Sequence, residues 1–165
     1  MNTKLIKKFL VAGLALVALM AGEAFAQATT SVVTVNAQVN AACRFITGTA
    51  TLTLANSGAV IDPATASDAT GNVNLIYRCT SGTNPGFDID NSTVFADPKS
   101  RVVTLTGAGN LPATIRVTGG GPGSGMGGSG DKTAVVDGTI AYTPDIENAA
   151  VGAYTKDVTI TIQDN

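Results

Sequence analysis

Residues 72–83 read NVNLIYRCTSGT and contain the pattern that decides the fold. Val73, Leu75, Tyr77 and Cys79 stand at every second position, mostly with polar residues between them. Successive side chains of a β-strand point to opposite faces of a sheet, so this spacing predicts a strand with one buried face. The Thr-Ser-Gly-Thr run that follows it is typical of a tight turn.

Outside this segment, the chain repeats short β-rich runs separated by turn residues. No stretch after residue 26 has a helical hydrophobic period of useful length. Further strands are expected in residues 45–54, 87–89, 102–105, 114–118, 135–142 and 154–162. About seven or eight short strands with regular turns predict an all-β fold, an Ig-like β-sandwich.

The two ends of the predicted domain carry the clearest alternation. In residues 27–41, Val33, Val35, Ala37 and Val39 fall on one face, which predicts an N-terminal strand. At the other end, four apolar residues share a face of a predicted C-terminal edge strand: Tyr154, Val158, Ile160 and Ile162. Only three residues follow Ile162, so the last predicted strand is also the end of the sequence.

Residues 1–26 have the order of a secretory signal peptide. Three lysines precede an apolar run over residues 9–20, and Ala24-Phe25-Ala26 supplies the small residues of a cleavage site. Cleavage is expected between Ala26 and Gln27. An apolar run of about a dozen residues is too short for a spanning helix, which leaves an uncleaved membrane anchor as the alternative. The sequence thus predicts an exported protein with no membrane span after cleavage.

Composition limits the classes of partner. Removal of residues 1–26 takes away three lysines and one glutamate, which changes the formal net charge from −2 to about −4. No basic patch is present to bind a phosphate backbone, so a nucleic acid partner is not expected. The mature chain is the right size for one domain with one core.

The only cysteines are Cys43 and Cys79. In an oxidising compartment an isolated pair favours one disulfide, which would close a loop of about 35 residues and contribute about 3–4 kcal/mol. Two buried free thiols are the alternative. A metal site is disfavoured because the chain has no histidine and no second cysteine pair.

Catalytic residues are not recognisable in this sequence. Without histidine there is no Ser-His-Asp arrangement, and paired cysteines leave no thiolate nucleophile. Asp88, Asp90 and Asn91 resemble a calcium-binding cluster only loosely, because the full ligand spacing is missing. We therefore expect no enzyme activity, no cofactor and no metal. The run GGGPGSGMGGSG at residues 119–130 predicts a flexible hairpin tip.

Several motifs, taken in order, resemble the spore coat protein U domain family, which is shared with archaic chaperone–usher pilins. They are Cys43 after the alternating segment, Thr51-Leu52-Thr53-Leu54, Ile61-Asp62-Pro63, and a strand that ends in Cys79-Thr80-Ser81-Gly82-Thr83. Near the C-terminus, Gly138-Thr139-Ile140 and the run from Gly152 to Ile162 also match the family. The family's usual Asn-Phe-Gly is replaced by Ala55-Asn56-Ser57-Gly58, and residues 119–130 have no counterpart.

This resemblance implies a sandwich over residues 42–165 that lacks its final strand and is completed by a strand from another chain. Residues 27–41 are the expected donor strand, and Val33, Val35, Ala37 and Val39 are the expected plugs. The implied partners are a periplasmic chaperone, an outer-membrane usher and further pilus subunits, including copies of this chain. The alternative is an ordinary first strand that pairs within its own domain.

The function expected from these features is that of an exported structural subunit of a bacterial surface fibre (pilus) or coat, at the cell surface or outside the cell. The alternative is a self-contained secreted adhesive or binding module. Sugar-binding sites usually use exposed aromatic rings, and the chain has no Trp and only three Tyr, so a lectin is less favoured.

Overall fold

The structure is a computed structural model that describes residues 33–165. The chain divides after Gln38 into two units, and the second unit, Val39–Asn165, contains the strands. The expected signal peptide, and its cleavage site between Ala26 and Gln27, lie outside the described residues.

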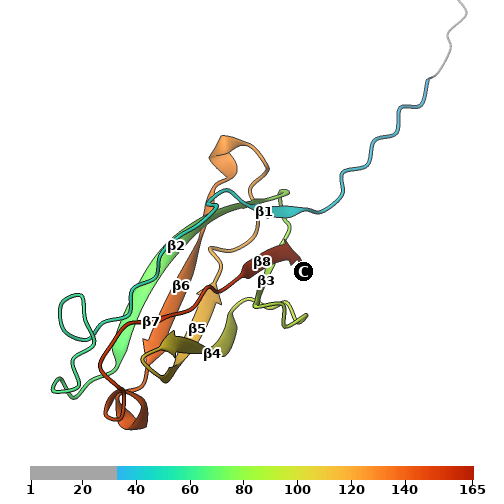
Figure 1. The fold of residues 1–165 in the computed structure, drawn as a ribbon. Helices are drawn as coiled ribbons and strands as arrows, with labels where there is room; N and C mark the ends of the chain where they lie inside the picture. Colours follow the sequence, from blue (N-terminus) through green and yellow to red (C-terminus); the bar gives the residue numbers. More distant parts are fainter. Residues whose placement is uncertain (1–32) are drawn as a thin grey trace, which may run out of the picture. The chain divides into compact units, whose positions relative to one another are not determined.

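The described residues form antiparallel strands in two sheets (Figure 1). The strands are β1 (Cys43–Phe45), β2 (Ala69–Cys79), β3 (Pro85–Ile89), β4 (Lys99–Gly107), β5 (Asn110–Thr118), β6 (Lys132–Ile140), β7 (Tyr154–Thr155) and β8 (Ile160–Asp164). One sheet has the order β1-β2-β6-β5-β4-β7, and the other pairs β3 with β8. Two short helical turns lie at Gly128–Gly130 and Tyr142–Ile146. The prediction of an all-β, sandwich-like fold is confirmed.

The large sheet forms its core face from alternate residues of its central strands. β2 and β6 make the longest ladder, from Ala69 opposite Ile140 to Tyr77 opposite Lys132. Every second residue of β5 and β6 is buried, as the period of a half-buried strand requires. The alternation seen in residues 72–83 therefore correctly predicts which face of β2 points inward.

The small sheet covers one end of this face. Phe87 and Ile89 of β3 are completely buried. The Phe87 ring meets Tyr77 of β2 edge-on, with centroids 5.7 Å apart, and lies 6.2 Å from the ring of Phe45 in β1. These three rings join the two layers where β1, β2 and β3 come together.

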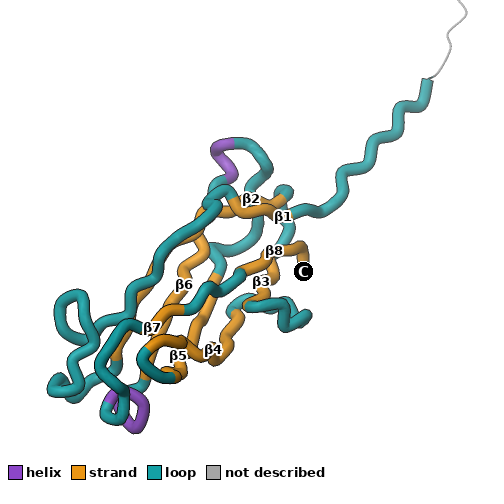
Figure 2. The backbone as a smooth tube through the Cα atoms, viewed as in Figure 1, coloured by secondary structure: helices purple, strands orange, loops and turns teal. Residues whose placement is uncertain are grey.

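Two predicted strands are shorter or differently placed in the structure. Of residues 45–54, only Phe45 belongs to a strand, and the chain from there to β2 is drawn as loop except for isolated bridges (Figure 2). The predicted strand over residues 154–162 is divided: β7 pairs with β4 in the large sheet, whereas β8 pairs with β3. Alternation alone does not reveal this change of sheet, because both parts keep the same apolar period.

Candidate functional site

The disulfide predicted between Cys43 and Cys79 is present. The two residues are direct partners in the β1–β2 ladder, with their Cα atoms 4.1 Å apart. The alternative of two free thiols is excluded. Because β1 has only three residues, the cross-link holds a strand that its ladder bonds alone would hold weakly.

One edge of β8 has no strand partner among the described residues. β3 pairs along the opposite edge, from Pro85 opposite Asp164 to Ile89 opposite Ile160, and Asp90 continues that ladder by donating its N–H to the Thr159 carbonyl. Figure 1 shows β3 and β8 side by side. We call the unpartnered side of residues 160–164 the open edge. Unpaired backbone groups of this kind can accept a further strand.

Apolar side chains accompany the open edge. Val158, Ile160 and Ile162 are partly buried and pack against the core cluster. Tyr154 is the remaining member of the four apolar residues predicted on the C-terminal strand. It also packs against the core, but it belongs to β7. The predicted apolar face therefore exists, although it is shared between two strands.

Leu52 and Leu54 supply apolar side chains from a segment without strand structure, residues 46–54. This segment lies against two glycines that are direct partners across the β2–β6 ladder, Gly71 and Gly138. A Cβ atom at Gly71 would come within 2.0 Å of the Thr53 carbonyl oxygen. At Gly138 it would come within 2.5 Å of a Leu54 methyl and 2.9 Å of a Leu52 methyl. The glycine pair thus makes room for this segment on the core face.

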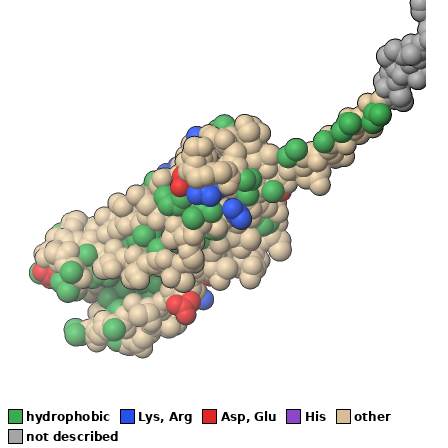
Figure 3. Space-filling model, turned by 90° about the horizontal axis from the view of Figure 1, so that it is seen from above, with side chains coloured by type: hydrophobic (Ala, Val, Ile, Leu, Met, Phe, Trp, Pro, Cys, Tyr) green, Lys and Arg blue, Asp and Glu red, His purple; other side chains and the backbone are tan. Residues whose placement is uncertain are grey.

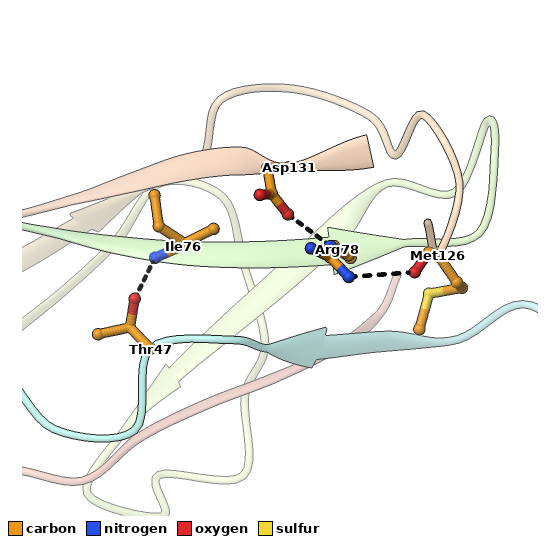
Figure 4. Close-up of polar contacts among 5 residues, drawn as sticks. All are labelled: Thr47, Ile76, Arg78, Met126 and Asp131. Atoms are coloured by element: carbon orange, nitrogen blue, oxygen red, sulfur yellow. Dashed lines mark hydrogen bonds and ion pairs between the residues drawn. The ribbon is translucent and has the colours of Figure 1, made fainter. Parts of the chain in front are cut away.

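Polar contacts at the β1 end fix the start of the same segment (Figure 4). The Ile76 N–H donates to the Thr47 hydroxyl over 2.8 Å, and the Ile46 N–H donates to the Ile76 carbonyl. On the same strand, Arg78 pairs with Asp131 and also donates to the Met126 carbonyl. The hydrogen bond and charge of Asp131 raise the pKa of Arg78, although the pair is solvent-exposed enough to contribute little stability.

The described part of the expected N-terminal strand forms no strand. Residues 33–42 lack strand structure, and the side chains of Val33, Val35 and Val39 are 78%, 85% and 81% exposed. Ala37 is exposed as well. For these residues the alternative of an ordinary first strand that pairs within its own domain is not observed, because alternation supplies an apolar side but not a ladder partner. Donation to a second chain stays a prediction.

The glycine-rich segment is more ordered than predicted. The Tyr77 hydroxyl donates to the Gly121 carbonyl over 2.8 Å, and the Gly125 N–H donates to the Cys79 carbonyl. Gly123 exchanges backbone hydrogen bonds with Gly82 and Thr83. A Cβ atom on Gly123 would lie 2.5 Å from two carbonyl oxygens, so glycine permits this close approach. The predicted hairpin is confirmed, because the segment joins β5 to its antiparallel neighbour β6, but the loop is hydrogen-bonded to the end of β2 and is not a free tip.

Asp88 is buried, and its carboxylate accepts hydrogen bonds from neighbouring residues of the chain. Its carboxylate accepts hydrogen bonds from the Ile89, Ser92 and Thr93 N–H groups and from the Ser92 hydroxyl. Burial acts to raise the pKa of Asp88, but these hydrogen bonds and the charge of Lys99 outweigh it and lower the pKa. Among residues 33–165, no cluster of three acidic, cysteine or histidine side chains is arranged to hold a metal ion.

A shallow recess lies where β5, β7 and the Tyr142–Ile146 turn meet. Its lining includes Pro112, Asp145, Asn148 and Tyr154. The Tyr154 hydroxyl donates to the Ala150 carbonyl, and the Asn148 amide donates to the Pro144 carbonyl. Two of the polar groups that would orient a ligand are therefore engaged within the protein.

On the face drawn in Figure 3, charged side chains are sparse, and apolar ones lie among backbone and other uncharged side chains. No helix within residues 33–165 is both long and apolar enough to cross a membrane. Comparison with protein-family models, curated proteins and solved structures found no match to this chain.

Two features of the site were not recognised from the sequence. The first is the glycine pair: β6 runs unbroken through Gly138, whose ladder partner in β2 is Gly71. Small residues at corresponding positions of two predicted strands are a usable signal for a segment that packs on them. The role of the Thr80 hydroxyl, described below, has no sequence signal beyond its place after Cys79.

Proposed function

We propose that the chain is an exported structural subunit of a bacterial surface fibre (pilus) or coat, assembled by donation of an N-terminal strand from one copy to the next. The observation that carries the proposal is the open edge of β8 with its partly buried apolar side chains. The same chain carries exposed valines at alternate positions in residues 33–39. An edge with no strand partner among the described residues and a segment with exposed valines at alternate positions are the two halves of a strand-addition joint.

The energetics of such a joint are favourable. Burial of three valine side chains contributes about 1.5–3 kcal/mol each. Each new backbone hydrogen bond adds about 0.5–1.5 kcal/mol. The resemblance to archaic chaperone–usher pilins adds a periplasmic chaperone that protects the edge before assembly and an outer-membrane usher that catalyses exchange. Both partners belong to the proposal.

The first experiment expresses the full chain behind its own leader, with and without residues 27–41. The intact chain should give detergent-resistant ladders on unboiled gels, and the deletion should remove them. A synthetic peptide of residues 29–41 should then raise the melting temperature of the shortened protein.

A matched pair of variants controls for general damage to the segment. Val33, Val35 and Val39 are changed together to Asn in one variant, which should abolish the ladder. Thr34, Asn36 and Gln38 are changed together to Ser in the other, which should keep it. A stable monomer from the intact chain, unaffected by the deletion, would instead identify the self-contained secreted binding module.

A further inference from the structure

The Thr80 side chain contacts the residues that immediately precede β1. Its hydroxyl oxygen accepts the Ala42 N–H over 3.2 Å and lies 3.4 Å from the carbonyl oxygens of both Asn40 and Ala42. The Thr80 backbone N–H donates to the Ala42 carbonyl over 2.9 Å. Thr80 therefore contacts two of the three residues before Cys43, namely Asn40 and Ala42, through its side chain and backbone. We call this set of contacts the Thr80 clamp.

The Thr80 clamp extends the antiparallel pairing of β1 with β2 beyond the Cys43–Cys79 pair. β1 is antiparallel to β2, with Cys43 opposite Cys79 and Phe45 opposite Tyr77. The chain before Cys43 is thus bound beside Thr80 and directed past the end of β2, not back along it. This direction is a property of residues 40–43, which lie within the strand-bearing unit.

The open edge and its apolar side chains extend the other way. Phe87, which meets Tyr77, is the ladder partner of Ile162, and Ile89 is the partner of Ile160. From the β1 end, the apolar side chains therefore run from Ile162 to Ile160 and on to Val158, away from Thr80. The N-terminal segment of the same chain would have to reverse at residues 40–42 to cover them.

We propose that Thr80 is a positioning residue that prevents this reversal, so that the N-terminal segment completes the sheet of a second copy and not that of its own chain. The inference rests on the proposed function and adds to it a reason why polymer is favoured over a closed monomer. A short tether gives an effective concentration on the order of millimolar, so at micromolar protein self-closure would win unless geometry forbids it.

The test compares Thr80→Val with Thr83→Val in the full chain. Valine keeps the β-branched shape of threonine and removes the hydroxyl. Thr83 lies in the same turn and makes its hydrogen bonds to Thr80 and Gly123 through its backbone, so it is the matched control. Loss of one hydrogen bond changes an equilibrium by about two- to tenfold. Thr80→Val should lower the ratio of ladder to monomer by that factor, whereas Thr83→Val should not.

Hydrogen exchange of residues 33–41 in the monomer fraction is the second readout. Self-closure predicts that these amides become protected in Thr80→Val monomer, with a melting temperature independent of protein concentration. A ladder equal to that of the unsubstituted chain overturns the inference. So does a weaker ladder without new protection of residues 33–41, because that result indicates ordinary destabilisation.

The experiment separates this inference from the proposed function. If the unsubstituted chain forms no ladder, the proposed function fails, and hydrogen exchange alone then decides whether the clamp directs the segment. Circular dichroism and the mass of the oxidised protein confirm folding. Should Thr80→Val not fold, Thr80→Ser, which keeps the hydroxyl, is compared with Thr80→Ala by the same two readouts. Equal behaviour of the Ser and Ala variants overturns the inference.

Discussion

Replacement of Gly71 by alanine should displace the segment that carries Leu52 and Leu54. The added Cβ would lie 2.0 Å from the Thr53 carbonyl oxygen and 3.0 Å from its carbon. Both are backbone atoms, so no side-chain rotation relieves the overlap, and residues 52–54 must move away from the sheet. Real Cβ atoms do not approach a carbonyl oxygen so closely, which makes this displacement unavoidable.

The size of the effect follows from the burial of the two leucines. Complete burial of one leucine contributes about 1.5–3 kcal/mol, and both side chains are only partly buried. Alanine also offsets part of the loss, by about 0.4–1 kcal/mol, because it restricts the unfolded chain. The expected net loss in the free energy of unfolding is about 2 kcal/mol. For a domain of this size, that loss lowers the melting temperature by about 4–8 °C.

Urea denaturation followed by circular dichroism measures this loss, and Gly138→Ala is the control. At Gly138 the nearest atoms are methyl groups of Leu52, Leu54 and Ile115, which can rotate, so a loss below about 1 kcal/mol is expected. Equal stability of Gly71→Ala and the unsubstituted chain would refute the packing of residues 52–54 on β2. A larger loss of unfolding free energy for Gly138→Ala than for Gly71→Ala would contradict the conclusion that the backbone next to Gly71 is less able to move than the methyl groups next to Gly138.

Three further perturbations have defined outcomes. Reduction of the Cys43–Cys79 disulfide should lower the free energy of unfolding by about 3–4 kcal/mol, measured as a lower urea midpoint in dithiothreitol; an unchanged midpoint would show that β1 does not need the cross-link. Because the pKa of Asp88 is lowered on folding, its contribution is present above its ordinary value of 3.8 and is lost as the pH falls through the lower, folded value. Asp88→Asn should therefore reduce stability at pH 7 and flatten the acid limb of the stability profile, and an unaltered profile would contradict this. Asn56→Ala should increase protease cleavage within residues 56–67, because the Asn56 amide donates to the carbonyls of Asp62, Thr65 and Ser67, and mass spectrometry of the fragments tests it.

The sequence predicts the strands that pair at length and the disulfide between two of them. β2 and β4 through β6 follow from alternation bounded by turn residues, because a half-buried ladder imposes a period of two, whereas β3 is buried along its whole length. The sequence does not predict that residues 154–162 divide into two strands of different sheets. Tyr154 and Ile160 belong to one apolar period, yet they pair with strands of different sheets, and pairing depends on neighbours distant in sequence.

The glycine-rich loop shows a different limit. The glycine content indicates a flexible backbone, but the missing side chains also allow the loop to lie closer to the β2 backbone than other residues could. Tyr77 and Cys79 supply the hydrogen-bond partners that fix the loop, and neither is adjacent to it in sequence. The open edge, likewise, is visible only after every strand has been assigned its neighbours, whereas the valines at residues 33–39 are recognisable at once.

The position of the disulfide has a mechanical consequence. Tension applied to the chain ahead of Cys43 passes through a covalent bond into Cys79, so residues 44–78 lie inside a closed covalent loop and outside the line of load. The three residue pairs of β1 and β2 are therefore bypassed as a point of rupture, and the load continues from Cys79 along the backbone toward β3 and its ladder with β8. A molecule pulled from its N-terminal side would therefore gain no length from residues 44–78 while the cross-link is intact.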